Sequence, residues 1–332
     1  MTWNLENFQR PAVGGDTSAY DRKLAQLVQV IVAADPDLVG MQEVLARPLD
    51  LTPASFEDLC SALTTASGVL WHGVTSSRPD QRGIRVGWLA RGSLTNSVEV
   101  AEYPPGVPPV TVDDDGSTIT AAKRGALAIT YTRDDGLSID AVTVHFKSKL
   151  LSLPGRRPGQ TRFTTNDESE RARYGLYALD QRAAEAVTAR SWTTTALADD
   201  GSRRNVLLCG DLNDTPEAAT TQLLLGPPGS QIDTGGFDQP DQGDNNRLWN
   251  LGPAMPPGDP AAGIPPANWS RINNGVKELI DQILVSHQLV NALASTEALP
   301  LDGIPNVTAN PASAVSATAP SDHRPVVARF NL

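Results

Sequence analysis

The chain has 332 residues, 40% hydrophobic and 20% charged, so it can bury a large core, and its formal net charge is −11 at pH 7. This charge argues against a protein that holds nucleic acid on a broad basic surface, but not against an enzyme that recruits a divalent cation. Two cysteines and four histidines are too few for a disulfide framework or a Cys/His zinc module, and no apolar run is long enough to span a membrane.

The first elements deliver acidic and amide side chains at the ends of strands. A strand expected over Thr2–Phe8 places Asn4 and Glu6 on one face by simple alternation. Apolar residues at helical spacing then predict an amphipathic helix over Ser18–Ala34. A second short strand, Leu38–Gln42, is followed at once by Glu43. This strand, helix and strand are too closely spaced to be anything but neighbouring parts of one sheet.

The next segment is rich in strands and closes on a histidine. The residues Arg133-Asp-Asp-Gly136 favour a hairpin turn between two apolar runs, and the second run leads to His145. The Pro/Gly-rich residues 104–109 and the acidic residues 113–115 that follow are typical of turns and a loop. The other expected elements are a helix over 54–66 and strands over 69–74, 84–90, 97–102, 125–132 and 138–146.

Basic residues gather around and after this histidine, although the chain as a whole is acidic. Between Pro154 and Tyr174 the sequence contains several arginines and few acids, and a long helix over about Ser169–Ala198 follows. The basic excess could hold substrate phosphates, but a solvated loop with charges at a helix start explains it equally well. The candidate substrate-binding residues are Arg124, Lys147, Lys149, Arg162 and Arg171.

The stretch Leu207–Pro216 combines a buried strand with polar residues at its end. Gly210 breaks the apolar run just before Asp211 and Asn213, as expected where the carboxyl end of a strand contributes to a cleft. A lone motif of this kind more often caps a helix through an Asx-turn. The functional interpretation is nevertheless preferred over a simple helix cap, because other acid- and histidine-bearing stretches also adjoin apolar runs.

The last third of the sequence adds three further polar side chains next to strands. A short helix near Glu217–Leu224 leads into residues 226–275, an irregular stretch typical of a lid or rim loop. A strand over 278–286 carries Asp281 among apolar residues, so this acid needs a partner. Asp322 and His323 precede a final strand that ends at Phe330. No linker is evident, so residues 1–332 are interpreted as one domain.

Carboxylate and amide side chains without cysteine favour a hard cation, Mg²⁺ or Mn²⁺, rather than zinc. Such a cation commonly accompanies phosphate substrates. A serine hydrolase is disfavoured, because the adjacent residues Ser321, Asp322 and His323 cannot form a relay and the sequence has no G-x-S-x-G elbow. The sequence has no Walker-type phosphate loop either.

Six motifs in this order resemble the endonuclease/exonuclease/phosphatase superfamily, which is DNase I-like, and in particular its bacterial nuclease-like members. They are T-W-N-L-E at 2–6, G-M-Q-E-V at 40–44, V-H-F-K-S at 144–148, G-D-L-N-D at 210–214, I-D-Q-I-L-V-S at 280–286 and S-D-H-R-P-V at 321–326. The resemblance implies a four-layer α/β sandwich, in which two mixed β-sheets pack face to face with helices outside.

The resemblance also implies roles for the polar residues. Glu43 would be the principal metal ligand, and one metal is expected, with a second open. Asp211 would orient or deprotonate the attacking water, and Asn213 would hold the phosphate or that water. His323, fixed by Asp281, and His145 would contact the phosphate or the leaving oxygen. The remaining metal ligands would be Asn4, Glu6 and Asp322.

The function predicted on this basis is divalent-metal-dependent phosphodiester hydrolysis, most simply by a nuclease acting on DNA or RNA. A phosphatase or a sphingomyelinase-like phospholipid phosphodiesterase is the alternative, favoured by the acidic pI of about 4.8 and by the lack of an aromatic and basic stacking track. A binding module on an inactive scaffold is disfavoured, because all the expected site residues are present.

No obligate protein partner is indicated. With no visible leader, the sequence as it stands predicts a cytoplasmic protein, although a secreted bacterial protein without its leader would look the same.

Overall fold

Two six-stranded sheets form the centre of the protein in the computed structural model, which describes residues 1–45, 53–153, 155, 161–225, 245–262, 266–307 and 319–332. Sheet A has the strand order β15-β17-β1-β2-β4-β3. Its strands are β1 (Thr2–Phe8), β2 (Leu38–Leu45), β3 (His72–Thr75), β4 (Ile84–Ala90), β15 (Leu293–Ala298) and β17 (Val326–Phe330).

Sheet B has the order β11-β14-β10-β9-β8-β5. Both sheets mix parallel and antiparallel pairs, because β1 runs parallel to β2 and β9 runs parallel to β10, while the other neighbours are antiparallel. The strands of sheet B are β5 (Ser93–Glu102), β8 (Ala121–Thr132), β9 (Ser138–His145), β10 (Val206–Asp211), β11 (Trp249–Asn250) and β14 (Asp281–Val285).

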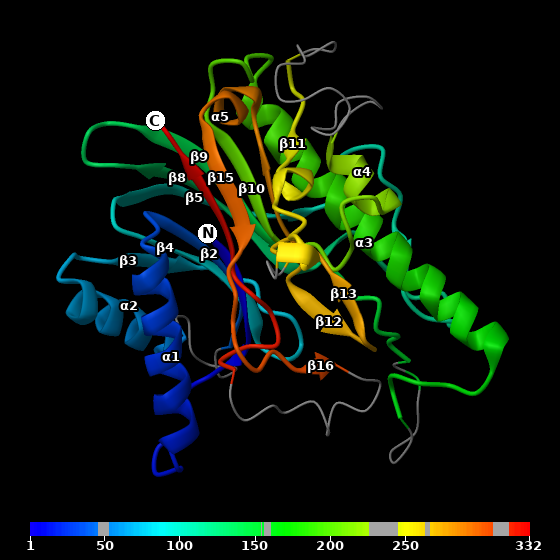
Figure 1. Ribbon diagram of the computed structural model, residues 1–332. Helices are drawn as coiled ribbons and strands as arrows, with labels where there is room; N and C mark the ends of the chain where they lie inside the picture. The colour runs from blue at the N-terminus through cyan, green and yellow to red at the C-terminus, as the bar shows by residue number, and fades with distance from the viewer. Residues whose placement is uncertain (46–52, 154, 156–160, 226–244, 263–265, 308–318) are drawn as a thin grey trace.

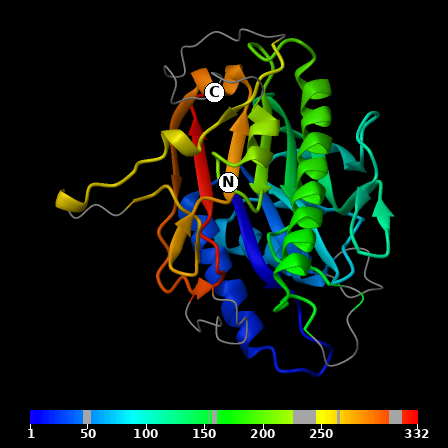
Figure 2. The ribbon, with the colours of Figure 1, turned by 90° about the vertical axis from the view of Figure 1, so that its right-hand side faces the viewer.

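Helices cover the outer faces of the two sheets. Figure 1 shows α1 (Ser18–Ala34) and α2 (Ala54–Ser67) on the side of sheet A, and α3 (Glu168–Leu197) and α4 (Ala219–Leu225) on the side of sheet B. Seen from the side, α3 runs along sheet B for most of the height of the molecule (Figure 2). The shorter elements are α5 (His287–Asn291), the 3-10 turns η2 (Gly252–Ala254) and η3 (Pro260–Ala262), and the strands β6 (Val110–Thr111), β7 (Thr118–Ile119), β12 (Arg271–Asn273), β13 (Val276–Glu278) and β16 (Asn306–Val307).

Three separate hydrophobic clusters hold these layers together. One lies between the sheets and contains Trp88 of β4 and Ile283 of β14. A second joins sheet B to α3 and α4 through residues such as Ala186. The third joins sheet A to α1 and α2, where Ile31 and Leu59 are fully buried. Three cores between four layers confirm the predicted α/β sandwich.

The sheets approach each other closely where small or polar residues replace large apolar ones. A Cβ atom added to Gly40 of β2 would lie 2.7 Å from Cys209 Sγ of β10. One residue pair further along, Gln42 Nε2 donates a 2.9 Å hydrogen bond to Thr143 Oγ1 of β9. The two sheets are therefore joined by side-chain hydrogen bonds as well as by apolar packing, and these bonds lie toward the end where β2 and β9 finish.

The element bounds differ from the sequence prediction mainly in the second half. The expected strand over 278–286 is divided, because β13 ends at Glu278 and β14 begins at Asp281. The expected loop after Pro109 contains the small β6–β7 hairpin, and the region expected to be irregular contains β11 and β12. Residues 226–244 of that region, and Arg156 and Arg157 of the basic segment, lie outside the described residues.

Candidate active site

The polar residues predicted at strand ends come together at one end of the sandwich. Parallel pairing of β1 with β2, and of β9 with β10, places the carboxyl ends of these four strands in the same direction. Asp211 at the end of β10 lies opposite Asp281 at the start of the antiparallel β14. β17 is antiparallel to β1, so Asp322 and His323, which precede β17, lie toward the carboxyl end of β1.

Irregular backbone in β1 and β2 positions the two glutamates. The register of the parallel pair shifts between Asn4 and Phe8, and positive φ angles occur at Glu6 (+47°), Asn7 (+52°) and Glu43 (+58°). Such bulges redirect side chains that regular alternation would place elsewhere. Side chains compensate the lost pairing, since Asn4 Oδ1 accepts a 2.9 Å hydrogen bond from the amide of Glu6 and Glu43 Oε2 accepts one of 2.9 Å from the amide of Asn7.

Glu6, Glu43 and Asp322 form a cluster of mutually repelling carboxylates. Burial raises the pKa of Glu6, and the negative charges of Asp322 and Glu43 raise it further. Lys23 is the nearby cation, but its Nζ donates to the carbonyl oxygen of Glu6 at 2.7 Å rather than to a carboxylate. Carboxylate oxygens are the ligands that Mg²⁺ or Mn²⁺ prefers, and a cation near these three acids would neutralise their charge. The donor set therefore fits the expected cation.

Asp211 is buried at the centre of the site. It is 2% exposed, its Oδ2 accepts a 3.0 Å hydrogen bond from Asn4 Nδ2, and its Oδ1 accepts one of 2.8 Å from the amide of Asn213. Burial and the negative charge of Asp281 raise the pKa of Asp211 to about 6. The Asn213 side chain donates to the carbonyl oxygen of Phe146 at 2.9 Å, so it also joins the ends of β9 and β10.

His323 is paired with a buried acid. Its Nδ1 lies 2.6 Å from Asp281 Oδ2, and Asp281 is fully buried. Burial alone would lower the pKa of His323, but the charges of Asp281 and Asp322 and the hydrogen bond to Asp281 raise it to about 10. The main chain is fixed as well, because Trp3 Nε1 donates to the His323 carbonyl at 2.9 Å and Ser321 Oγ accepts from the His323 amide at 3.0 Å. The expected pairing of His323 with Asp281 is present in the structure.

The pKa of His145 is shifted in the opposite direction to that of His323. Its Nε2 faces two acids, at 3.6 Å from Asp211 Oδ2 and 4.0 Å from Glu43 Oε1. Burial lowers the pKa of His145 well below its usual value, and the positive charges of Arg124 and His323 lower it further. One histidine of the site is therefore neutral near pH 7, while the other is charged.

A second group of potential metal ligands consists of different residues. One ligand atom each from Asp211, Asp281 and His323 lies within 4.8 Å of the others. In this group His323 Nδ1 is already occupied by its 2.6 Å contact with Asp281, and the raised pKa of His323 disfavours the neutral ring that binds a metal. The structure thus offers two sets of candidate ligands, and Asp211, Asp281 and His323 are the set whose ligand atoms lie close together.

The predicted substrate-binding residues do not form one surface. Arg124 is close enough to lower the pKa of His145, and its Nε lies 3.3 Å from Asp80 Oδ2. Lys149 pairs with Asp214 at 3.0 Å. Arg171 pairs with Glu168 at 2.6 Å on the exposed first turn of α3, where a helix-start charge suffices to explain it. Arg162 is an exposed residue, and Lys147 Nζ donates to the carbonyls of Ser148 and Leu150.

Two arginines near the site were not identified from the sequence. Arg82 and Arg271 both carry charges that lower the pKa of His145. Arg82 lies in the turn before β4, with Nε 3.9 Å from Asp80, and Arg271 on β12 pairs through its backbone with His323 and through Nη2 with Asp322 at 3.7 Å. Neither follows an apolar strand-like run directly, so the pattern that identified the other residues could not find them.

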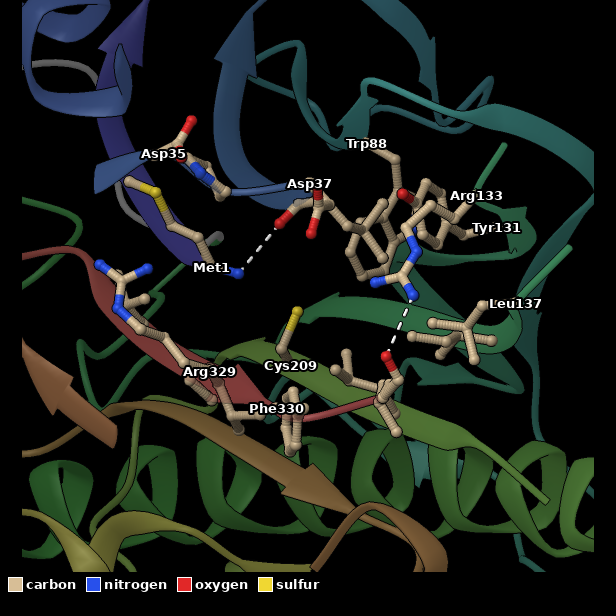
Figure 3. Close-up of a pocket in the computed structure, with 18 residues that line it drawn as sticks. Met1, Asp35, Asp37, Trp88, Tyr131, Arg133, Leu137, Cys209, Arg329 and Phe330 are labelled. Atoms are coloured by element: carbon tan, nitrogen blue, oxygen red, sulfur yellow. Dashed lines mark hydrogen bonds between the residues drawn. The ribbon is translucent and has the colours of Figure 1, made fainter. Parts of the chain in front are cut away.

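A cavity of about 270 Å³ lies at the opposite end of the sandwich (Figure 3). It is lined at the amino ends of β2 and β9 by Leu38 and Ile139, and by aromatic side chains such as Tyr131. Of its charged residues, Arg133 pairs with Asp135 and donates to the Leu332 carbonyl at 3.2 Å, and Arg329 donates to the Ala34 carbonyl. None of the predicted site residues lines it, so the chemistry belongs to the other end.

Solved structures with this architecture come from several organisms. An endonuclease/exonuclease/phosphatase from Bacteroides vulgatus is 18% identical, with a TM-score of 0.53 over 98% of this chain and 95% of that one. The human nocturnin catalytic domain with bound sulfate is 16% identical, with a TM-score of 0.52 over 99% and 93%. A 3′ phosphatase from Neisseria, bound to product DNA hairpin, is 17% identical, with a TM-score of 0.50 over 100% and 98%. At these identities the likeness shows the fold.

Sequence comparison assigns the family. No curated protein sequence matches the chain. Within the described residues, no helix is both long and apolar enough to cross a membrane. The sequence pattern of the Endonuclease/Exonuclease/phosphatase family, however, matches residues 1–323. The chain therefore belongs to the endonuclease/exonuclease/phosphatase family and is an enzyme that hydrolyses phosphate esters.

Proposed function

We propose that this enzyme is a divalent-metal-dependent phosphodiesterase that cleaves nucleic acid by direct attack of an activated water. The observation that carries the proposal is the meeting of a buried acid with a raised pKa, Asp211, and a charged histidine, His323, beside a cluster of three carboxylates. Hydrolysis of a phosphodiester needs a base for the water, a donor to the phosphoryl oxygens and a cation to offset their charge.

Asp211 is proposed as the base. A pKa of about 6 leaves it ionised at neutral pH but still able to accept a proton, which is the balance that general-base catalysis requires. Its hydrogen bonds from Asn4 and from the Asn213 amide fix the direction of its oxygens. Asn213 is proposed to hold the phosphate through the second hydrogen of its Nδ2, or the attacking water through its side-chain oxygen, since one Nδ2 hydrogen is donated to the Phe146 carbonyl.

The two histidines are proposed to act on the phosphate. With its Nδ1 held by Asp281, His323 would donate from Nε2 to a phosphoryl oxygen and stabilise the negative charge that develops there. Neutral His145, whose Nε2 faces Asp211 and Glu43, would contact the phosphate or the leaving oxygen. A divalent cation held by Glu43, Glu6 and Asp322, with Asn4 alongside, would offset charge on the phosphoryl oxygens.

The nucleic-acid substrate is supported by cations on two sides of the site. Arg82 and Arg124 approach His145 from the β3–β4 turn and β8, while Arg271 approaches from β12. A chain of phosphates that crosses the site would meet positive charge on both sides. The Neisseria 3′ phosphatase, which shares the fold, was solved with a DNA product.

The test is a turnover assay with Mg²⁺, Mn²⁺ or EDTA on plasmid DNA, RNA oligonucleotides, bis-p-nitrophenyl phosphate and p-nitrophenyl phosphate. Cleavage of nucleic acid and of the diester is expected with either metal, and EDTA should abolish it. His323→Ala should lower kcat by roughly 10²–10³-fold, the usual cost of removing one donor to a developing charge. Glu43→Gln should weaken metal binding, which would be measured as a higher Mg²⁺ concentration at half-maximal rate.

A small-phosphate substrate is the second candidate, favoured by the net charge of −11, which disfavours binding a long polyanion. Activity on the monoester alone would support a phosphatase. Release of phosphocholine from sphingomyelin, with no cleavage of nucleic acid, would support a phospholipid phosphodiesterase. Either result would overturn the nuclease proposal and leave the same residues in place.

A further inference from the structure

The inner face of α3 carries two buried charged residues that neither the family motifs nor the proposed chemistry uses. Arg182 and Glu185 are three residues apart and so lie on one side of the helix, and each is only 5% exposed. Burying a charged side chain costs free energy unless it is paired and hydrogen-bonded. Their position against sheet B, behind the ends of β9 and β10, indicates what they contribute.

Arg182 bridges the two turns that follow the catalytic strands. Its Nη1 donates a 3.0 Å hydrogen bond to the carbonyl oxygen of Lys147, two residues after His145. Its Nε donates a 3.0 Å hydrogen bond to Asp214 Oδ2, one residue after Asn213. One planar guanidinium therefore fixes the distance between the turn that carries His145 and the turn that carries Asn213.

Other bonds hold both ends of this bridge. Glu185 Oε2 accepts a 2.6 Å hydrogen bond from the amide of Lys147, so both backbone polar groups of Lys147 are bound to α3. At the other end, Asp214 Oδ2 also accepts from Thr220 Oγ1 at 2.6 Å, and the Asp214 carbonyl accepts from Gln282 Nε2 at 2.6 Å. The bridge thus connects two anchored segments rather than two loose ones.

We propose that Arg182 is a positioning residue that holds the His145 turn and the Asn213 turn in the arrangement required for hydrolysis. The inference rests on the proposed phosphodiesterase function. Asn213 has a positive φ of +52°, a left-handed conformation that asparagine tolerates better than most residues, so its turn has a specific local geometry to keep. Small displacements of catalytic groups are expensive, because about 1 Å can cost on the order of 10²-fold in rate.

The experiment compares Arg182→Gln and Arg182→Lys with Arg190→Gln, each in the full chain with Mg²⁺ and bis-p-nitrophenyl phosphate. Arg190 is a matched control, because it lies on the same helix and also donates to backbone carbonyls, those of Leu224 and Asn246, away from the catalytic turns. Arg182→Gln is expected to lower kcat by about 10²-fold with KM changed less than threefold. Arg182→Lys, which keeps the charge but not the fork, should recover only part of the loss, and Arg190→Gln should keep kcat within twofold.

An Arg182→Gln variant with kcat within twofold of wild type, or a loss equal to that of Arg190→Gln at equal Tm, would overturn the inference. A wild-type protein inactive on every phosphodiester would instead refute the proposed function. The bridge would then be judged by amide hydrogen exchange of peptides that cover 145–149 and 211–215. Exchange should accelerate in Arg182→Gln but not in Arg190→Gln, and unchanged exchange would refute the bridge itself.

Discussion

The two histidines of the site show how neighbouring charges decide protonation inside a protein. Both are buried, which disfavours the charged ring, yet their pKa values move in opposite directions. Asp281, at 2.6 Å, raises the pKa of His323, while the charge of Arg124 lowers the pKa of His145 further. At one and the same pH, the site can thus contain one protonated ring that donates a proton and one neutral ring.

The free energy of unfolding should fall at alkaline pH because of His323. Below 6.5, the ordinary pKa of histidine, the ring is protonated in both states; between there and about 10 only the folded state keeps the proton. Stability is therefore fully present at low pH and is lost as pH rises through this window, by up to about 1.4 kcal/mol per pH unit for one proton. Urea denaturation in EDTA at pH 7 and pH 9.5 would measure it.

His323→Gln is the direct control, because it removes the titrating ring. Its stability should depend less on pH across the same window than that of the wild type. Asp281→Asn should also flatten the dependence, since the main charge that raises the His323 pKa is lost. Equal pH dependence in wild type and His323→Gln would contradict the assignment.

Most candidate residues could be identified from the sequence, because a polar residue beside an apolar run is a local signal. Asp211 and His323 stand out in this way. The contacts could not be predicted, because they join distant segments; the 3.0 Å bond from Asn4 to Asp211, for example, spans 207 positions. Arg82, Arg182 and Arg271 lack the local signal and required the structure.

At the level of elements, regular periodicity predicted bounds well. The strand Thr2–Phe8, the helix Ser18–Ala34 and the strand Ile84–Ala90 agree with the structure residue for residue. β15 was missed because Leu293–Ala298 is an edge strand with a single large apolar residue, Leu293, and no apolar alternation. The bulges of β1 and β2 were missed because alternation describes only a regular strand, whereas Glu6 and Glu43 have positive φ.

Gly210 is the element-level feature with the strictest steric requirement. It lies in β10 with φ of +146°, and a Cβ atom there would come within 2.0 Å of the Val144 carbonyl oxygen on β9. Gly210→Ala should therefore destabilise the protein by on the order of 3 kcal/mol, because the two strands would have to separate. Chemical denaturation of the variant would measure the change.

Gly136→Ala separates backbone strain from steric overlap. Gly136 has a φ of +91° in the β8–β9 turn, with no atom within 4 Å of the added Cβ. This variant should lose only about 1–2 kcal/mol from the unfavourable backbone angle. A Gly210→Ala loss no greater than that of Gly136→Ala would show that β9 and β10 adapt easily.

On the scale of the whole molecule, each sheet combines strands from distant parts of the chain, and the two sheets share one core. β1 lies between β17 and β2, so segments from both ends of the chain meet in the middle of sheet A. The cluster between the sheets contains residues from both, such as Val86 and Leu127. This interdependence supports the proposal that residues 1–332 form one domain.

One domain should unfold in one step. Differential scanning calorimetry is expected to show a single transition whose calorimetric and van't Hoff enthalpies agree. Because β17 pairs on both sides, deletion of residues 326–332 should abolish this transition rather than lower its midpoint slightly. Two resolved transitions in the full chain would indicate separate folding units instead.

The place of β17 between β15 and β1 also sets an order of events during synthesis on the ribosome. Sheet B is composed of residues 93–285 and can pair fully while translation continues. Sheet A cannot, because β1 gains its second neighbour only after Val326 of β17, far along the chain, has been made. Long waits of this kind slow folding and leave a strand edge open to wrong partners. Asp322 and His323, which precede β17, therefore join the rest of the site late.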